Sequence, residues 1–121
     1  MSKIKSVIAI ALALTVFTPQ MASAATCDSG RFCIFVDANF GGDMYSYSVQ
    51  STGTWINLSS ARSDVMSSWI NNTNRDVLLA ENVSGGGIII CADDLNSDSW
   101  VGSSFNDLLS SFMFTSTTTY C

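Results

Sequence analysis

Asn106-Asp107-Leu108-Leu109-Ser110-Ser111 is the second copy of a six-residue motif whose first copy is Ser63-Asp64-Val65-Met66-Ser67-Ser68. In both copies an aspartate stands three residues before a pair of serines, and an aromatic residue follows the pair. The aspartates lie 22 residues after Gly42 and 21 residues after Gly86, each of which belongs to a glycine turn. Two motif copies in register with two glycine turns indicate an internal repeat of about 43 residues.

Each repeat contains short apolar or alternating segments separated by turn residues, which is typical of β-strands. The first unit, about 31–72, has predicted strands at 32–36, 44–49, 55–58 and 65–70. The second unit, about 76–115, has them at 77–80, 88–91, 100–101 and 112–114, and a Thr-rich β tail runs to 121. The sequence therefore predicts an all-β fold, two Greek keys packed as a small β-sandwich. We expect much of its core to come from Tyr45, Tyr47, Trp55, Trp69, Trp100, Phe112 and Phe114.

The first 24 residues resemble a secretory signal peptide rather than part of the fold. Lys3 and Lys5 precede an apolar run from Val7 to Phe17, which is too short to span a bilayer, and Ala22-Ser23-Ala24 is a small-residue cleavage signal. We therefore expect a secreted, extracellular protein whose mature domain spans 25–121.

The mature domain is acidic and contains no lysine. Three arginines and all ten acidic residues of the chain remain, which gives a net charge of −7. Such a domain repels phosphate backbones and anionic lipids, so we expect neither nucleic acid nor a membrane as its partner. Cations, or a basic patch on another protein, suit it better. We expect a monomer.

All four cysteines lie in the mature domain, and an even count in a small exported domain predicts two disulfides. Three pairings are possible. We favour Cys27–Cys33, which closes a short loop around Gly30, and Cys91–Cys121, which ties down the end of the chain. The second bond closes a loop of 30 residues, worth about 3–4 kcal/mol on the chain-entropy model.

The stretch from Phe35 to Gly42 reads aromatic, four residues, aromatic, one residue, glycine. This spacing resembles the Greek-key signature of the βγ-crystallins. The copy that begins at Asn106 matches the calcium-binding pattern of that superfamily, and the copy that begins at Ser63 matches it except at its first position. In the second key, Gly86 takes the place of the signature glycine, with Leu79 and Ser84 at the aromatic positions.

Within this superfamily the opening Cys27-Asp28-Ser29-Gly30-Arg31-Phe32-Cys33 is similar to peptidase inhibitor family I36. Asn39-Phe40-Gly41-Gly42 and Trp69-Ile70-Asn71-Asn72-Thr73 carry the same resemblance. The resemblance implies inhibition of an extracellular metalloproteinase, which would be the partner. The inhibitor prototype of the family has a second compact disulfide loop, whereas Cys91 has no cysteine close to it in this sequence.

The βγ-crystallin resemblance also implies up to two Ca²⁺ sites, since carboxylate, amide and hydroxyl oxygens are the ligands that calcium prefers. One ligand set would be Asp37 with Asn106, Asp107 and Ser110. The other would be Glu81 with Ser63, Asp64 and Ser67, and it should be weaker because Ser63 has no carboxylate or amide oxygen. Two bound ions would change the net charge from −7 to −3. The alternative is that the motif now only shapes a turn.

Catalysis is poorly supported, and we expect no enzyme. The chain has no histidine, which removes the usual general base and imidazole metal sites. The acidic loop 94–99 imitates the start of an EF-hand but has Ser99 at its glycine position and Phe105 at its glutamate position. Two classes remain open: a peptidase inhibitor, and a calcium-binding domain with a structural, stress or toxin-like role. The candidate inhibitor loops are 50–54, 85–87 and 93–99.

Overall fold

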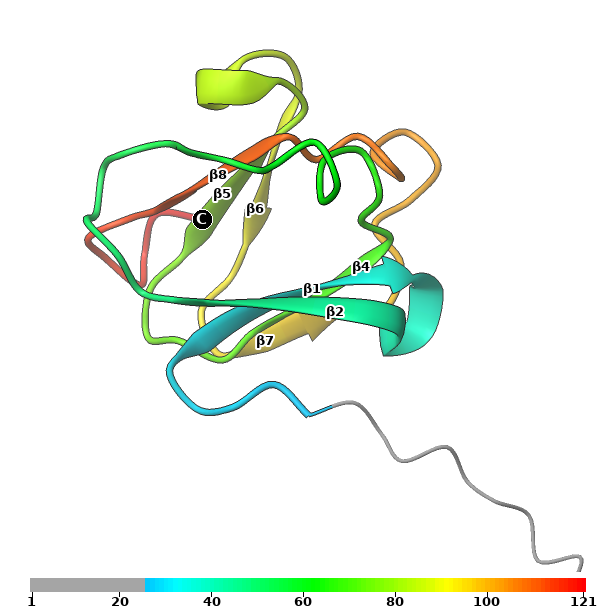
Figure 1. Ribbon diagram of the computed structural model, residues 1–121. Helices are drawn as coiled ribbons and strands as arrows, with labels where there is room; N and C mark the ends of the chain where they lie inside the picture. Colours follow the sequence, from blue (N-terminus) through cyan, green and yellow to red (C-terminus); the bar gives the residue numbers. More distant parts are fainter. Residues whose placement is uncertain (1–25) are drawn as a thin grey trace, which may run out of the picture.

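The computed structural model describes residues 26–121, so the predicted signal peptide at 1–24 lies outside the described residues. Two four-stranded antiparallel sheets pack face to face (Figure 1). The first sheet has the strand order β2-β1-β4-β7, and the second has the order β3-β8-β5-β6. None of the helices in the described part of the chain is long and apolar enough to cross a membrane. The predicted all-β sandwich is confirmed.

The elements follow the chain in two similar series. The first repeat contains β1 (Arg31–Asp37), the 3-10 turn η1 (Ala38–Phe40), β2 (Gly41–Ser48), β3 (Ile56–Asn57) and β4 (Ser68–Asn71). The second contains β5 (Val77–Ala80), the 3-10 turn η2 (Val83–Gly85), β6 (Ile89–Ala92), β7 (Asn96–Asp98) and β8 (Ser111–Phe114).

The two repeats exchange their third strands. β3 pairs with β8 of the second repeat, and β7 pairs with β4 of the first. Each sheet therefore consists of three strands from one repeat and one from the other. Because neither sheet is complete within its own repeat, each Greek key depends on the other for its edge strand.

The core lies between the sheets and is rich in phenylalanine. Phe112 packs against Phe32 and Phe114, with ring centroids 5.5 and 5.6 Å apart. Five of the seven expected core aromatics lie in the core or pack against it, but two are elsewhere. Trp100 is 46% exposed, and Trp55 does not belong to the described apolar side chains packed on the core. Fully buried core residues that we did not predict include Phe32, Ile34, Met66, Leu79, Phe105 and Leu109.

The main differences from the predicted strands lie in three segments. The segment 65–67 forms part of the motif loop, so β4 begins only at Ser68. The third strand of the second repeat is β7, within the predicted acidic loop, and 100–101 is not a strand. The Thr-rich stretch 115–120 also forms no strand; its threonine hydroxyls make local hydrogen bonds to backbone groups instead.

Both favoured disulfides are confirmed. Cys27 and Cys33 have Cα atoms 6.0 Å apart, and Cys91 and Cys121 have them 5.9 Å apart. The first bond fixes the chain just before β1, and the second fixes the segment after β8 to β6.

Candidate functional site

The two copies of the motif lie directly against each other. The Asp64 N–H donates to the Leu109 carbonyl (2.8 Å), and the Asp107 N–H donates to the Met66 carbonyl (3.0 Å). Both aspartates have a φ of 61°, a left-handed conformation that aspartate tolerates better than most residues. The fully buried side chains of Met66 and Leu109 anchor the two loops in the core. The repeat seen in the sequence is thus a local two-fold arrangement of two loops.

The last serine of each motif has a structural task that needs no metal ion. The Ser68 hydroxyl donates to the Asp37 carbonyl (2.7 Å) and accepts from the Phe40 N–H (3.0 Å). In the second repeat, the Ser111 hydroxyl donates to the Asn82 carbonyl (2.6 Å) and accepts from the Gly85 N–H (3.0 Å). These serines therefore hold the turns η1 and η2 onto β4 and β8.

This symmetry corrects the alignment of the second Greek-key signature. Asn82 occupies the position of Asp37, so Ala80, Gly85 and Gly87 stand where the first repeat has Phe35, Phe40 and Gly42. The residues expected from the sequence are each one position too early: Leu79, Ser84 and Gly86. The expected alignment has an offset of 44 residues, whereas the turns are 45 residues apart and the motifs are 43 apart.

The first serine of each serine pair forms a hydrogen bond with the opposite copy of the motif. The Ser67 hydroxyl donates to the Asn106 side-chain oxygen at 2.5 Å. The Ser110 hydroxyl donates to an Asp64 carboxylate oxygen (3.1 Å) and accepts from the Ser63 hydroxyl (2.9 Å). In our sequence-based ligand sets, Ser110 stood with Asn106 and Ser67 with Asp64. The structure exchanges these two serines, because the loops cross each other head to tail.

The two remaining predicted ligands come from the hairpins. Asp37 is exposed, and its carboxylate lies against Gly42, where an added Cβ would come within 2.8 Å of Oδ2. The Glu81 carboxylate accepts the Ile88 N–H at 3.1 Å. Glu81 follows the buried Ala80 and is the counterpart of Val36, not of Asp37. A ligand role for either carboxylate remains a prediction.

The polar groups that meet at the crossed loops offer only oxygen atoms. One group contains Asn106 and Ser67, and the other contains Ser63, Asp64 and Ser110. Asp107 is exposed beside the first group. Amide, hydroxyl and carboxylate oxygens fit a hard cation such as Ca²⁺ better than a metal that prefers thiolate or imidazole. The donor chemistry therefore fits calcium.

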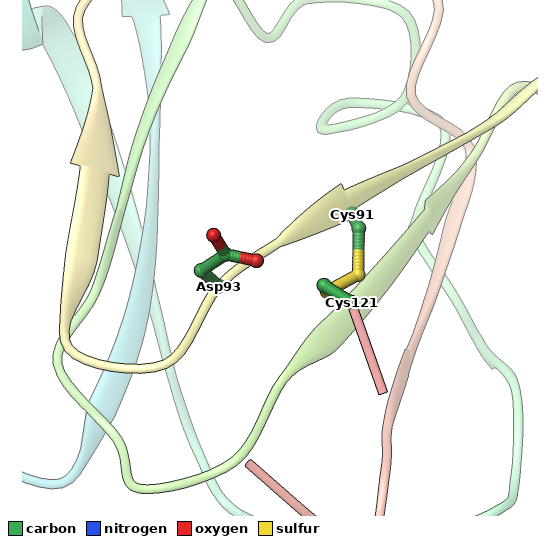
Figure 2. A group of neighbouring side chains, drawn as sticks. All are labelled: Cys91, Asp93 and Cys121. Atoms are coloured by element: carbon green, nitrogen blue, oxygen red, sulfur yellow. A yellow bond between two sulfur atoms is a disulfide. The ribbon is translucent and has the colours of Figure 1, made fainter. Parts of the chain in front are cut away.

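A third cluster is excluded as a metal centre by its chemistry. Within residues 26–121, Cys91, Asp93 and Cys121 form the one group of three cysteine, histidine or acidic side chains whose ligand atoms lie within 4.8 Å of one another. Figure 2 shows that the two sulfur atoms are bonded to each other and that the Asp93 carboxylate lies beside them. Disulfide sulfurs are not thiolates, so this cluster lacks the ligands that a soft metal needs.

Sequence reasoning missed a solvent-exposed apolar surface on the β5–β6 hairpin. Val83 is 59% exposed, Ile88 49% and Ile89 46%. The run Ile88-Ile89-Ile90 predicts a strand, but an apolar run carries no alternation that would tell which side chains face solvent. The tertiary structure shows that Ile88, just before β6, and Ile89, the first residue of β6, are exposed.

Comparison with solved structures identifies the fold. A double mutant of a βγ-crystallin domain from Clostridium beijerinckii is 26% identical with a TM-score of 0.60; the match covers 72% of this chain and 98% of that one. A structure described under the evolution of the eye lens βγ-crystallin domain fold has a TM-score of 0.63 at 18% identity, covering 78% and 93%. A βγ-crystallin domain from Flavobacterium johnsoniae has a TM-score of 0.52 at 22% identity, covering 69% and 91%.

Sequence comparison supplies the family. No curated protein sequence matches the chain significantly. Residues 20–92 match the profile of peptidase inhibitor family I36, and this segment contains the first Greek key, the first motif copy and the β5–β6 hairpin. With its βγ-crystallin fold and two disulfides, the chain belongs to peptidase inhibitor family I36.

Proposed function

We propose that this protein is a non-enzymatic inhibitor of an extracellular metalloproteinase and that the β5–β6 hairpin enters the peptidase cleft. The observation that carries the proposal is that three exposed apolar side chains, those of Val83, Ile88 and Ile89, lie on one hairpin. Exposed apolar side chains that gather on one element of a small domain are a common mark of a protein-binding surface. In Figure 1 the η2 turn projects beyond the ends of β5 and β6, where a partner can reach it.

The hairpin is held rigidly before any partner binds. The Ser84 N–H donates to the Asn57 side-chain oxygen (2.8 Å), and the Gly85 N–H donates to the Ser111 hydroxyl (3.0 Å). The Ile88 N–H is held by Glu81. A preorganised loop loses little conformational entropy on binding, which favours a tight inhibitor. Of the three loops considered from the sequence, 85–87 is the one next to the exposed apolar residues.

The first repeat indicates that the fold does not require this apolar surface. Ala38, Asp43 and Met44 stand at the positions of Val83, Ile88 and Ile89. The same hairpin therefore folds with a small and a charged side chain at two of the three positions. The apolar residues of the second hairpin are best explained by a partner.

Replacing Ile88 with aspartate should abolish inhibition without unfolding the domain. An aspartate already stands at the equivalent position in the first repeat, so the fold tolerates it. A buried charge in the peptidase cleft should raise the inhibition constant by about 100-fold or more, as the loss of a central interface residue does. The measurement is inhibition of a panel of secreted metallo-, serine and cysteine peptidases by residues 25–121.

Met44→Asp is the matched control, because Met44 is 40% exposed on the first hairpin. It should leave the inhibition constant within about two-fold of the wild type, as expected for a position outside a hot spot. Full activity of every peptidase in the presence of the wild-type protein would contradict the proposed function. Equal inhibition by Ile88→Asp and the wild type would instead reject this hairpin as the contact surface.

We also propose that the crossed motif loops bind calcium, which is the second candidate function. The oxygen groups described above support it, and the domain carries a net charge of −7 to be neutralised. The ion would be held by Asn106, Asp107 and Ser67, with Asp37 nearby, and a second ion by Ser63, Asp64, Ser110 and Glu81. Bound calcium would neutralise the carboxylates and cross-link the two repeats.

Calcium should raise the melting temperature of residues 25–121. A ligand at 100 times its dissociation constant adds about 2.7 kcal/mol, which corresponds to about 10 °C or more for a domain of this size. The shift between millimolar calcium and chelator should largely disappear in Asp107→Asn, which keeps a residue that accepts positive φ. The control variant Asp43→Asn, which lies outside the motifs, should show the same shift in melting temperature as the wild type. Identical melting temperatures of the wild type in calcium and in chelator would contradict calcium binding, and the motifs would then only shape the turns.

A further inference from the structure

Trp55 lies directly against the turn of the proposed inhibitory hairpin. A Cβ atom added to Gly85 would come within 2.2 Å of Trp55 Cε2 and 2.6 Å of its Nε1. Gly85 also has a φ of 78°. The indole ring thus occupies the space above the Gly85 backbone, and any side chain at position 85 would displace it.

The Trp55 ring does not pack against the hydrophobic core. Ile56 and Leu58 pack against the core cluster, but Trp55 is not among the partly buried apolar residues of the described chain that do so. Its neighbour Asn57 accepts the Ser84 N–H on the same turn. The segment 55–57 of the first repeat therefore contacts the η2 turn of the second repeat with a ring and with an amide oxygen.

In the first repeat a different aromatic ring packs at the equivalent turn, η1. Ile56 pairs with Phe112 in the second sheet, and Asp98 pairs with Trp69 in the first. Trp69 and Phe112 each follow the serine pair of a motif, so Asp98 corresponds to Ile56, and Ser97 takes the place of Trp55. On the turns, Gly85 corresponds to Phe40. In the first repeat the aromatic ring belongs to the turn itself, where Phe40 packs on Phe35 with centroids 5.7 Å apart. In the second repeat the ring at the turn is that of Trp55, which belongs to the other repeat.

We infer that Trp55 is a positioning residue that holds the η2 turn, and with it Val83 and Ile88, in the conformation that the peptidase cleft accepts. The inference rests on the proposed function of the hairpin. An aromatic residue on the turn would add bulk and fix the hairpin surface from within. With glycine at 85 the turn stays slim enough to enter a cleft, while the indole from the other repeat supplies the rigidity.

Trp55→Ala should loosen the turn and weaken inhibition without unfolding the domain. We expect amide hydrogen exchange at Ser84 and Gly85 to become about 10-fold faster or more, because local opening no longer has to displace the ring. The inhibition constant should rise by about 10-fold or more as the binding conformation becomes less populated. Exchange at core amides such as Leu79 should change far less than exchange at the turn. Trp55→Phe should restore both quantities to within about three-fold of the wild type.

Trp100→Ala is the control, because Trp100 is 46% exposed and belongs to the second repeat's own loop. It should change neither turn exchange nor inhibition. The inference is overturned if Trp55→Ala leaves turn exchange and inhibition within about two-fold of the wild type. It is also overturned if exchange accelerates equally throughout the domain, since Trp55 would then contribute only to global stability. If the wild type inhibits no peptidase, the positioning role fails with the proposed function, while the exchange data alone still report whether Trp55 holds the turn.

Discussion

Removal of the Cys91–Cys121 disulfide by a double alanine substitution should lower the free energy of unfolding by about 3–4 kcal/mol. The bond closes a loop of 30 residues that includes β7, the second motif copy and β8. In the chain-entropy account, opening this loop gives the unfolded chain more conformations and so favours unfolding. A loss of this size should lower the melting temperature by about 12 °C or more for a domain of under 100 residues.

The Cys27–Cys33 bond provides the comparison, because it closes a loop with a sequence separation of only 6. The same chain-entropy relation gives about 2 kcal/mol for the corresponding double alanine variant. Urea unfolding of both variants and of the wild type measures the two losses directly. A smaller loss for the Cys91 and Cys121 variant than for the Cys27 and Cys33 variant would contradict the loop-length argument.

Asp76→Ala should destabilise the domain by about 2–4 kcal/mol, because it removes a buried carboxylate that several donors share. Asp76 is 1% exposed. One carboxylate oxygen accepts the Cys121 N–H (2.8 Å), and the other accepts the Asp94 N–H (2.9 Å). The Asp76 backbone also exchanges hydrogen bonds with Thr115 and Thr117. The side chain therefore anchors both the end of the described chain and the turn after β6.

The stability contributed by Asp76 should depend on pH. Burial by itself would raise the pKa of this carboxyl, but the N–H donors from Cys121 and Asp94 outweigh it and hold the pKa below its ordinary value. A group with a lowered pKa in the folded state stabilises the protein above its unfolded pKa, near 4. That contribution is lost as the pH falls through the lower folded value. Asp76→Asn should therefore flatten the acid end of the stability curve, measured by urea unfolding between about pH 2 and 7.

Asp94 should show the opposite dependence and serves as the control. Burial, together with its hydrogen bond to Asp76 and the charge of that carboxylate, raises the pKa of Asp94. The stability linked to Asp94 is therefore present below its ordinary pKa and is lost as the pH rises through the raised value. Asp94→Asn should increase stability near neutral pH relative to the wild type. Parallel pH curves for the wild type and Asp76→Asn would refute the anchoring role of Asp76.

Much of the architecture could be predicted from short-range patterns. The alternating segment 44–49 could be predicted as a strand, because half-buried strands have a period of two, and most of it lies in β2. The cysteine spacing favoured the two disulfides that the structure contains. The two motif copies revealed the repeat, and the resemblance they carried led to the fold and the family that the comparisons show. These features are encoded by neighbouring residues, so one sequence is sufficient to find them.

The alignment of the two turns could not be fixed in the same way. The loop between turn and motif is two residues shorter in the second repeat, so equal spacing from the motif does not identify the signature glycine, and the expected alignment was one residue too early. The hydrogen bonds of Ser68 and Ser111 to the turns give the correct alignment, and these bonds join residues 26 to 31 positions apart. Sequence spacing alone does not contain that information.

The sequence by itself determined that this is a small, acidic, disulfide-linked β-domain built from two similar units, because periodicity, charge and cysteine spacing are local properties of the chain. Only the tertiary structure decided which groups meet across the repeats. The exchange of β3 and β7 places Trp55 on Gly85, and the head-to-tail crossing of the motif loops places Ser67 beside Asn106. Both arrangements follow from packing two incomplete sheets against each other, since each repeat can bury its open edge only by taking a strand from the other.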